Sequence, residues 1–211
     1  ECTTNIINRL LKHSDGNVYA FCNRSVFKCS MNQTVETVFP DIAIPSPTYS
    51  VAQAPDKDIY IGTESNGLYI YSENWKLKKH VPIDGIIATI LPDNNGDIWL
   101  GLDETGICLF NKNKQTFTWL HKDNTNLNNN SIRTFVSYGD SSILVGTFRG
   151  LNILNKKELT ITPANINIAG KGGLSHYSIH SMLIDKDQTL WIGTYSAGVN
   201  YHSPFYRPVS Y

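Results

Sequence analysis

The sequence predicts an all-β protein of the β-propeller class, because a strand-rich unit recurs five times along its 211 residues. Each unit contains a short apolar run centred on an anchor residue, and the anchors are Tyr19, Tyr60, Trp99, Leu144 and Trp191. Successive anchors are 41, 39, 45 and 47 residues apart, which is the repeat length of a four-stranded propeller blade. The apolar spacing of a helix is not evident in any segment.

The apolar runs are predicted to be buried strands. Their apolar residues are consecutive, as in Ile98-Trp99-Leu100, whereas a half-exposed strand would alternate. Two residues after the anchor, four runs carry a glycine that would let a neighbouring strand approach closely: Gly62, Gly101, Gly146 and Gly193. A second glycine then marks a hairpin turn before the third strand, at Gly67, Gly106, Gly150 and Gly198.

A short polar residue precedes every anchor by four positions: Asp15, Asp56, Asn95, Asp140 and Asp187. Such side chains hydrogen-bond the backbone of tight turns, so we expect a turn there between the innermost strand and the anchor strand. The outermost strands are more polar, as in 76–78 and 116–119. This composition is typical of an exposed blade edge.

The chain is predicted to be a single β-propeller domain or fragment over residues 1–211. The blade units fall at about 6–46, 47–85, 86–130, 131–177 and 178–211. The first and fourth copies depart from the pattern, with Phe21 at the glycine position and Leu144 as a non-aromatic anchor. The fifth copy has no clear outer strand. Either the N-terminal segment completes it in a five-bladed ring, or the chain is an arc of a larger propeller, which is our expectation.

Composition excludes several partners for this region. Eighteen Lys and Arg balance eighteen Asp and Glu, and no dense basic run predicts a nucleic-acid surface. No apolar run reaches the length of a membrane span and no leader is evident, so we expect membrane contact only through other parts of a parent protein. The four cysteines, Cys2, Cys22, Cys29 and Cys108, form neither a disulfide framework nor a zinc motif. Because Cys22 and Cys29 flank a predicted hairpin turn, the sequence leaves a disulfide between them as one alternative.

Three segments resemble a known family. The stretches Asp93-Asn-Asn-Gly-Asp-Ile-Trp-Leu-Gly, Ile59-Tyr-Ile-Gly-Thr and Leu190-Trp-Ile-Gly-Thr are similar to the two-component-regulator propeller repeat, found in the sensor region of hybrid two-component systems with histidine kinase and response regulator parts. The segment that begins at Trp191 and runs through Tyr-His-Ser-Pro resembles the end of the first propeller in that family. The resemblance covers nearly the whole chain.

The resemblance implies a periplasmic sensor, the extracytoplasmic part of an inner-membrane protein, that recognises oligosaccharides and controls polysaccharide-utilisation genes. It also implies self-association as a dimer, kinase activity only outside this region, and no enzymatic activity or cofactor in the chain itself. Two alternatives stay open. One is a propeller enzyme, either similar to streptogramin lyase or acting on glycans, and the other is a protein-interaction scaffold.

Propeller ligands commonly bind the loops between second and third strands and the loops between blades. The first set supplies Arg24, Glu64, Asp103, Glu104, Arg149 and Tyr195. The second set supplies Tyr49, Asn130, His176 and Tyr177. Charged groups could bind sugar hydroxyls while an aromatic ring stacks on a pyranose face. His176 and His180 lie on the same side of a predicted strand, but no third ligand completes a metal site.

Overall fold

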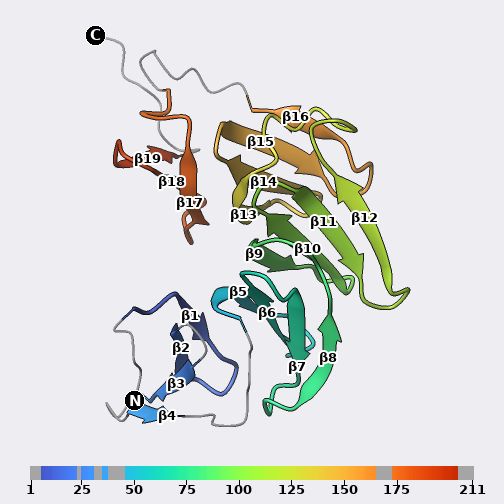
Figure 1. The fold of residues 1–211 in the computed structure, drawn as a ribbon. Coiled ribbons are helices and arrows are strands. Elements are labelled where there is room, and N and C mark those ends of the chain that lie inside the picture. The colour runs from blue at the N-terminus through green and yellow to red at the C-terminus, as the bar shows by residue number, and fades with distance from the viewer. Residues whose placement is uncertain (1–5, 23–24, 31–34, 38–45, 165–172, 204–211) are drawn as a thin grey trace. The chain divides into compact units, whose positions relative to one another are not determined.

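The computed structural model describes residues 6–22, 25–30, 35–37, 46–164 and 173–203, and within these every regular element is a β-strand (Figure 1). The strands form five sheets, here called blades 1 to 5, each built from consecutive strands. Blade 1 contains β1 (Arg9–Lys12), β2 (Val18–Cys22), β3 (Ser25–Cys29) and β4 (Val35–Thr37). Blade 2 contains β5 (Thr48–Gln53), β6 (Ile59–Thr63), β7 (Leu68–Tyr71) and β8 (Leu77–Val81).

The remaining blades repeat this order. Blade 3 contains β9 (Ile87–Pro92), β10 (Asp97–Leu102), β11 (Gly106–Asn111) and β12 (Thr116–Leu120). Blade 4 contains β13 (Ile132–Tyr138), β14 (Ser142–Thr147), β15 (Gly150–Asn155) and β16 (Ile161–Pro163). Blade 5 is described as three strands, β17 (Ile179–Ile184), β18 (Leu190–Thr194) and β19 (Val199–His202). The all-β class predicted from the repeat is confirmed.

The chain divides into two compact units, Glu1–Asp103 with Cys108–Trp119, and Glu104–Ile107 with Leu120–Tyr211. Blades 1 and 2 and most of blade 3 belong to the first unit, and blades 4 and 5 to the second. Within a unit, innermost strands of successive blades contact one another: β1 with β5, β5 with β9, and β13 with β17. Among the described residues there is no helix long and apolar enough to cross a membrane.

The five anchor runs form the second strand of each blade, as predicted. In the first unit, all five residues of β6 are buried. One face of β6 contributes Ile59 and Ile61 to a cluster with Tyr19 and Phe21 of blade 1. Its other face contributes Tyr60 to a cluster with residues of blade 3. Consecutive apolar residues are therefore explained by a strand that is covered on both sides.

The first glycine of the repeat lies under the innermost strand of the next blade. A Cβ on Gly62 would lie 2.7 Å from Cγ2 of Ile87, and one on Gly146 would lie 2.6 Å from Cγ2 of Ile179. Atoms of real side chains do not approach this closely, so only glycine permits the observed packing. The predicted reason for these glycines is confirmed at both positions.

The predicted polar turns occur in blades 1 to 3. Oδ1 of Asp15 accepts a hydrogen bond from the Asn17 amide at 2.9 Å, and Oδ1 of Asp56 accepts one from the Asp58 amide at 3.1 Å. Asn95 repeats the arrangement in blade 3. The residue after each of these has a positive φ, which the side-chain bond helps to stabilise.

The same prediction was wrong in detail for the last two blades. In blade 5 the acceptor is Asp185, whose Oδ1 binds the amides of Asp187 and Thr189, both at 2.9 Å. Asp187 is therefore a donor in that turn. In blade 4 the residue with positive φ is Gly139, so Asp140 lies after the strained position rather than before it.

A charged cluster joins blades 2 and 3 within the first unit. The buried carboxylate of Asp58 accepts hydrogen bonds from Nζ of Lys78 at 2.7 Å and from Nζ of Lys112 at 2.6 Å. Lys112 also binds Asp56 at 2.5 Å. Burial alone would lower the pKa of Lys112, but these two carboxylates outweigh it and raise that pKa. Burial would likewise raise the pKa of Asp56, but the bond from Lys112 leaves it below its ordinary value.

We expect Lys112→Met to lower the melting temperature by about 2–4 °C at neutral pH, because it breaks both bonds. The sign of each pKa shift sets the pH range. The lowered pKa of Asp56 means that its contribution is present above the unfolded pKa near 4 and is lost on acidification. The raised pKa of Lys112 means that its contribution is lost only at strongly alkaline pH. The difference in melting temperature between the two proteins should therefore shrink as the pH falls below about 4; a constant difference down to pH 2 would contradict this assignment.

The strand register separates Cys22 from Cys29. Cys22 pairs with Ser25 and Cys29 pairs with Val18, at opposite ends of the β2–β3 hairpin. Four residues of a strand span about 13 Å, whereas a disulfide needs Cα atoms within about 7 Å. A disulfide between these two residues is therefore incompatible with the hairpin.

Candidate functional site

One backbone hydrogen bond recurs at the same edge of four blades. The amide of the residue after the second strand donates to the carbonyl of the residue immediately before the first strand. The pairs are Glu64 to Pro47, Asp103 to Ile86, Phe148 to Ser131 and Tyr195 to Ser178, each at 3.0 Å. We call this the loop edge of a blade. In each of these four blades, the bond brings the loop between the second and third strands next to the loop that precedes the blade.

A β-bulge lies beside this bond in the innermost strand of the same four blades. The register skips one residue between Thr48 and Ser50, and likewise in the other three innermost strands. The skipped residues are Tyr49, Ala88, Arg133 and His180. A bulge re-aims the side chain that it carries and often lies next to a binding site.

The loop edges of blades 4 and 5, which both belong to the second unit, carry exposed aromatic rings. Phe148 and Tyr177 are almost half exposed and Tyr195 is 74% exposed. The ring of Tyr177 stacks on His176 with centroids 4.4 Å apart. The guanidinium of Arg133 lies 5.9 Å from the centre of the Phe148 ring. Exposed rings held by neighbouring groups keep their orientation, so this edge offers flat apolar surfaces beside cationic and hydrogen-bonding groups.

The predicted site residues are distributed over both units. Tyr49, Glu64 and Asp103 belong to the first unit. The second unit contains Glu104, Asn130, Arg149, His176, Tyr177 and Tyr195. Arg24 lies outside the described residues. Within the second unit, Tyr177 and Tyr195 are brought together by the bond between Tyr195 and Ser178.

Two of the predicted residues brace the loops. Oδ1 of Asn130 accepts the Lys122 amide at 2.8 Å, and its carbonyl accepts the Gly106 amide at 2.9 Å. Nδ1 of His176 accepts the Ser178 amide at 3.0 Å. Both residues therefore fix backbone at the loop edge. Glu64, Glu104 and Arg149 are exposed on their loops.

Sequence reasoning did not select three residues of this edge: Phe148, Arg133 and His180. Phe148 follows a Gly-Thr pair, as Glu64 and Tyr195 do, so strict alignment of the repeats would have found it. The positions of Arg133 and His180 depend on bulges, for which the sequence has no clear signal.

A metal centre is not formed by the residues that the structure describes, because no group of three or more of their His, Cys, Asp or Glu side chains could hold a metal ion. An open depression of about 400 Å³ in the second unit is lined by 123–126 and 159–161. It contains none of the predicted site residues. The side chains of Asn124 and Thr125 form hydrogen bonds with the backbone of His121 in their own loop. These polar groups therefore shape the loop and do not indicate a ligand.

Comparisons with known proteins support the fold. Residues 173–196 match the family model of the two-component regulator propeller. The chain is similar to the extracellular domains of the hybrid two-component systems BT3049 and BT4673 of B. thetaiotaomicron. The first has a TM-score of 0.73 and 24% identity over 94% of this chain and 27% of that one. The second has a TM-score of 0.74 and 18% identity, and the match covers 95% of this chain and 28% of that domain.

Streptogramin B lyase is also similar, with a TM-score of 0.62 and 13% identity over 94% of this chain and 68% of the lyase. No curated protein matches the sequence. The chain spans about a quarter of the length of the two sensor domains, and all three structures share its fold at low identity. The chain therefore has the β-propeller fold of extracellular domains of hybrid two-component systems, with a two-component-regulator propeller repeat at residues 173–196.

Proposed function

We propose that the chain is the ligand-sensing propeller region of a hybrid two-component signalling protein, located in the periplasm, and that it recognises oligosaccharides. The observation that carries this proposal is the set of exposed aromatic rings on the loop edge of the second unit, Phe148, Tyr177 and Tyr195. Two of them lie within the matched repeat. The extracytoplasmic location is supported by the description of the similar proteins as extracellular domains.

The chemistry of this edge suits a carbohydrate. A pyranose has an apolar face that packs on an aromatic ring, and hydroxyls that bind charged side chains such as Arg149. Because the Tyr177 ring already stacks on His176 and the Phe148 ring lies beside Arg133, these two side chains lose less conformational entropy on binding than unrestrained rings would. The role is one of binding rather than catalysis, and kinase activity is assigned to other parts of the parent protein.

The proposal is tested by thermal-shift screening against an oligosaccharide panel, followed by calorimetry on the hit. Alanine at Tyr195, Tyr177 or Arg149 is expected to weaken binding about tenfold each, since each removes about 1.4 kcal/mol of contact. Tyr138→Ala is the matched control, because this tyrosine is half exposed at the opposite end of β13. Unchanged affinity in all three variants would exclude this edge.

The same screen separates the other functions. A protein-interaction scaffold would show no stabilisation by any sugar, whereas a ligand stabilises the protein that binds it. Turnover of the hit would favour a glycan-active or lyase-like enzyme. We also propose that ligand binding is linked to dimerisation through an exposed face, which size-exclusion chromatography with and without the hit will measure.

A further inference from the structure

The side chains of the loop edge change character between blades 3 and 4. The donors of the loop-edge bond are, in chain order, Glu64, Asp103, Phe148 and Tyr195. The bulge residues of the same blades are Tyr49, Ala88, Arg133 and His180. Blades 2 and 3 therefore carry acids at this edge, whereas blades 4 and 5 carry aromatic rings and basic side chains. Because the chain as a whole has no net charge, the basic groups of blades 4 and 5 are a local feature.

The two basic bulge residues come from neighbouring strands. The innermost strands β13 and β17 contact one another within the second unit. The Cγ2 atoms of Thr134 and Ile179 lie 2.7 and 2.6 Å from the position of a Cβ added to Gly146. Arg133 and His180 directly adjoin these two residues in the chain. Blades 4 and 5 therefore place basic groups at neighbouring positions along one edge.

A second arginine stands beside the first. The guanidinium of Arg133 lies 5.9 Å from the centre of the Phe148 ring, and the exposed Arg149 directly follows Phe148 in the chain. The amide of Arg149 donates to the hydroxyl of Thr147 at 3.0 Å, which fixes the backbone that carries the guanidinium. Within the part of the chain that the structure describes, no ion pair engages the Arg149 side chain. Such a guanidinium can form two parallel hydrogen bonds with one anionic group.

The sequence segments that form these two edges contain neither Asp nor Glu. Blade 4 contributes 126–135 and 146–151, and blade 5 contributes 173–183 and 193–199. Glu104, on the loop of blade 3, is the single acid among the predicted site residues of the second unit. A neutral sugar needs no such imbalance, because its hydroxyls both donate to carboxylates and accept from cationic groups. An excess of basic groups beside exposed rings suits a sugar that carries negative charge.

We propose that the loop edges of blades 4 and 5 bind an acidic oligosaccharide. Its carboxylate or sulfate group accepts hydrogen bonds from Arg149, Arg133 adds positive potential, and its sugar rings pack on the exposed aromatic side chains. This ligand class rests on the proposed function and narrows it from oligosaccharides in general to charged ones. Loss of Arg149 should therefore cost more affinity for the acidic sugar than for a neutral form of the same sugar.

The test uses the full chain and an oligosaccharide panel with three arms: neutral, uronate-containing and sulfated. We expect hits in an acidic arm, and the arm that responds identifies the anionic group as a carboxylate or a sulfate. Calorimetry then compares the hit with its methyl-esterified or desulfated form, which keeps the same sugar rings. The acidic form should bind about tenfold more tightly. Raising the NaCl concentration from about 50 to about 500 mM should reduce that difference, because salt screens the charges.

Arg149→Gln removes the charge but keeps a polar side chain. It is expected to weaken binding of the acidic form about tenfold and to change binding of the neutralised form less than about twofold. Arg149→Lys should restore part of the preference, because it keeps the charge but not the paired hydrogen bonds. Lys157→Gln is the matched control, since Lys157 is exposed in the turn after β15, at the opposite end of blade 4. It removes one positive charge from the same unit and should leave both affinities unchanged.

Four results would overturn this ligand class. Hits in the neutral arm alone would do so and leave the proposed function intact. Equal affinity for the acidic and the neutralised form, or an equal effect of Arg149→Gln on both, would show that the arginine binds hydroxyls. An equal loss of affinity in Lys157→Gln would show an unspecific attraction to positive charge. A panel without any hit would contradict the ligand class and the proposed function together.

Discussion

The Gly62→Ala variant is expected to melt about 6–12 °C below the natural protein, corresponding to a loss of about 3 kcal/mol. The new methyl group would overlap the side chain of Ile87, whose Cγ2 is 2.7 Å from the position of the added carbon. Ile87 is fully buried and cannot swing away. Blades 2 and 3 would have to separate, which disturbs the apolar cluster between them. Thermal melts followed by circular dichroism will measure the change.

Gly193→Ala is the matched control for this substitution. Both glycines stand two residues after the anchor, and neither has a positive φ. The three atoms nearest to the added carbon at Gly193 all belong to Ser181, which is exposed and whose hydroxyl can rotate. A similar loss of stability in both variants would mean that the effect comes from strand propensity and not from packing between blades.

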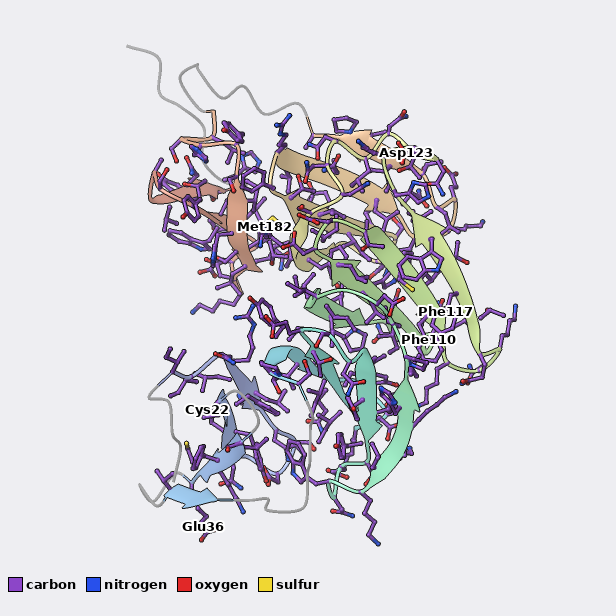
Figure 2. All side chains as sticks on the ribbon, viewed as in Figure 1. Cys22, Glu36, Phe110, Phe117, Asp123 and Met182 are labelled. Carbon is purple, nitrogen blue, oxygen red and sulfur yellow. The ribbon has the colours of Figure 1, made fainter. Side chains whose placement is uncertain are left out.

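Phe110→Ala is expected to remove about 3–5 kcal/mol from the free energy of unfolding, because it empties a large space in the core. Phe110 on β11 is completely buried in the cluster shared by blades 2 and 3. Figure 2 labels it beside Phe117 of β12, and the two rings stack with centroids 5.0 Å apart. Urea denaturation should show a lower midpoint with an unchanged slope.

Phe117→Ala provides the comparison for this second substitution. Phe117 contacts the same ring but is 42% exposed, so its loss opens no closed cavity and should cost under about 1 kcal/mol. If the two variants were equally unstable, most of the lost stability would come from the stacking of the two rings and not from the cavity.

The features that depend on repetition could be predicted from the sequence. The anchor strands and the two glycine positions recur in register, and each has a local physical reason that does not need the rest of the fold. Gly62, for example, could be assigned to a close approach before its neighbour Ile87 was known. The repeat also placed Glu64, Arg149 and Tyr195 on equivalent loops, which the structure confirms.

Other features depend on contacts between residues far apart in the sequence, or on which of several possible hydrogen bonds forms. Asp185 and Asp187 are both suitable turn residues, and only the backbone conformation decides that Asp185 accepts the bonds. The hydroxyl of Thr63, in the Gly-Thr pair, donates to the carbonyl of Gly67 at 2.8 Å and closes the hairpin. The repeated threonine was a signal for this role that sequence reasoning passed over. Bulges such as the one at Arg133 have no comparable signal in the sequence.

The amide–carbonyl bond at each loop edge uses backbone atoms alone. It is therefore indifferent to which side chain stands at its ends, as the acid Glu64 and the aromatics Phe148 and Tyr195 illustrate. Codon changes at these positions can exchange charge for aromatic surface without altering the scaffold. Descendants of one such gene could consequently diversify what they bind while inheriting the same architecture.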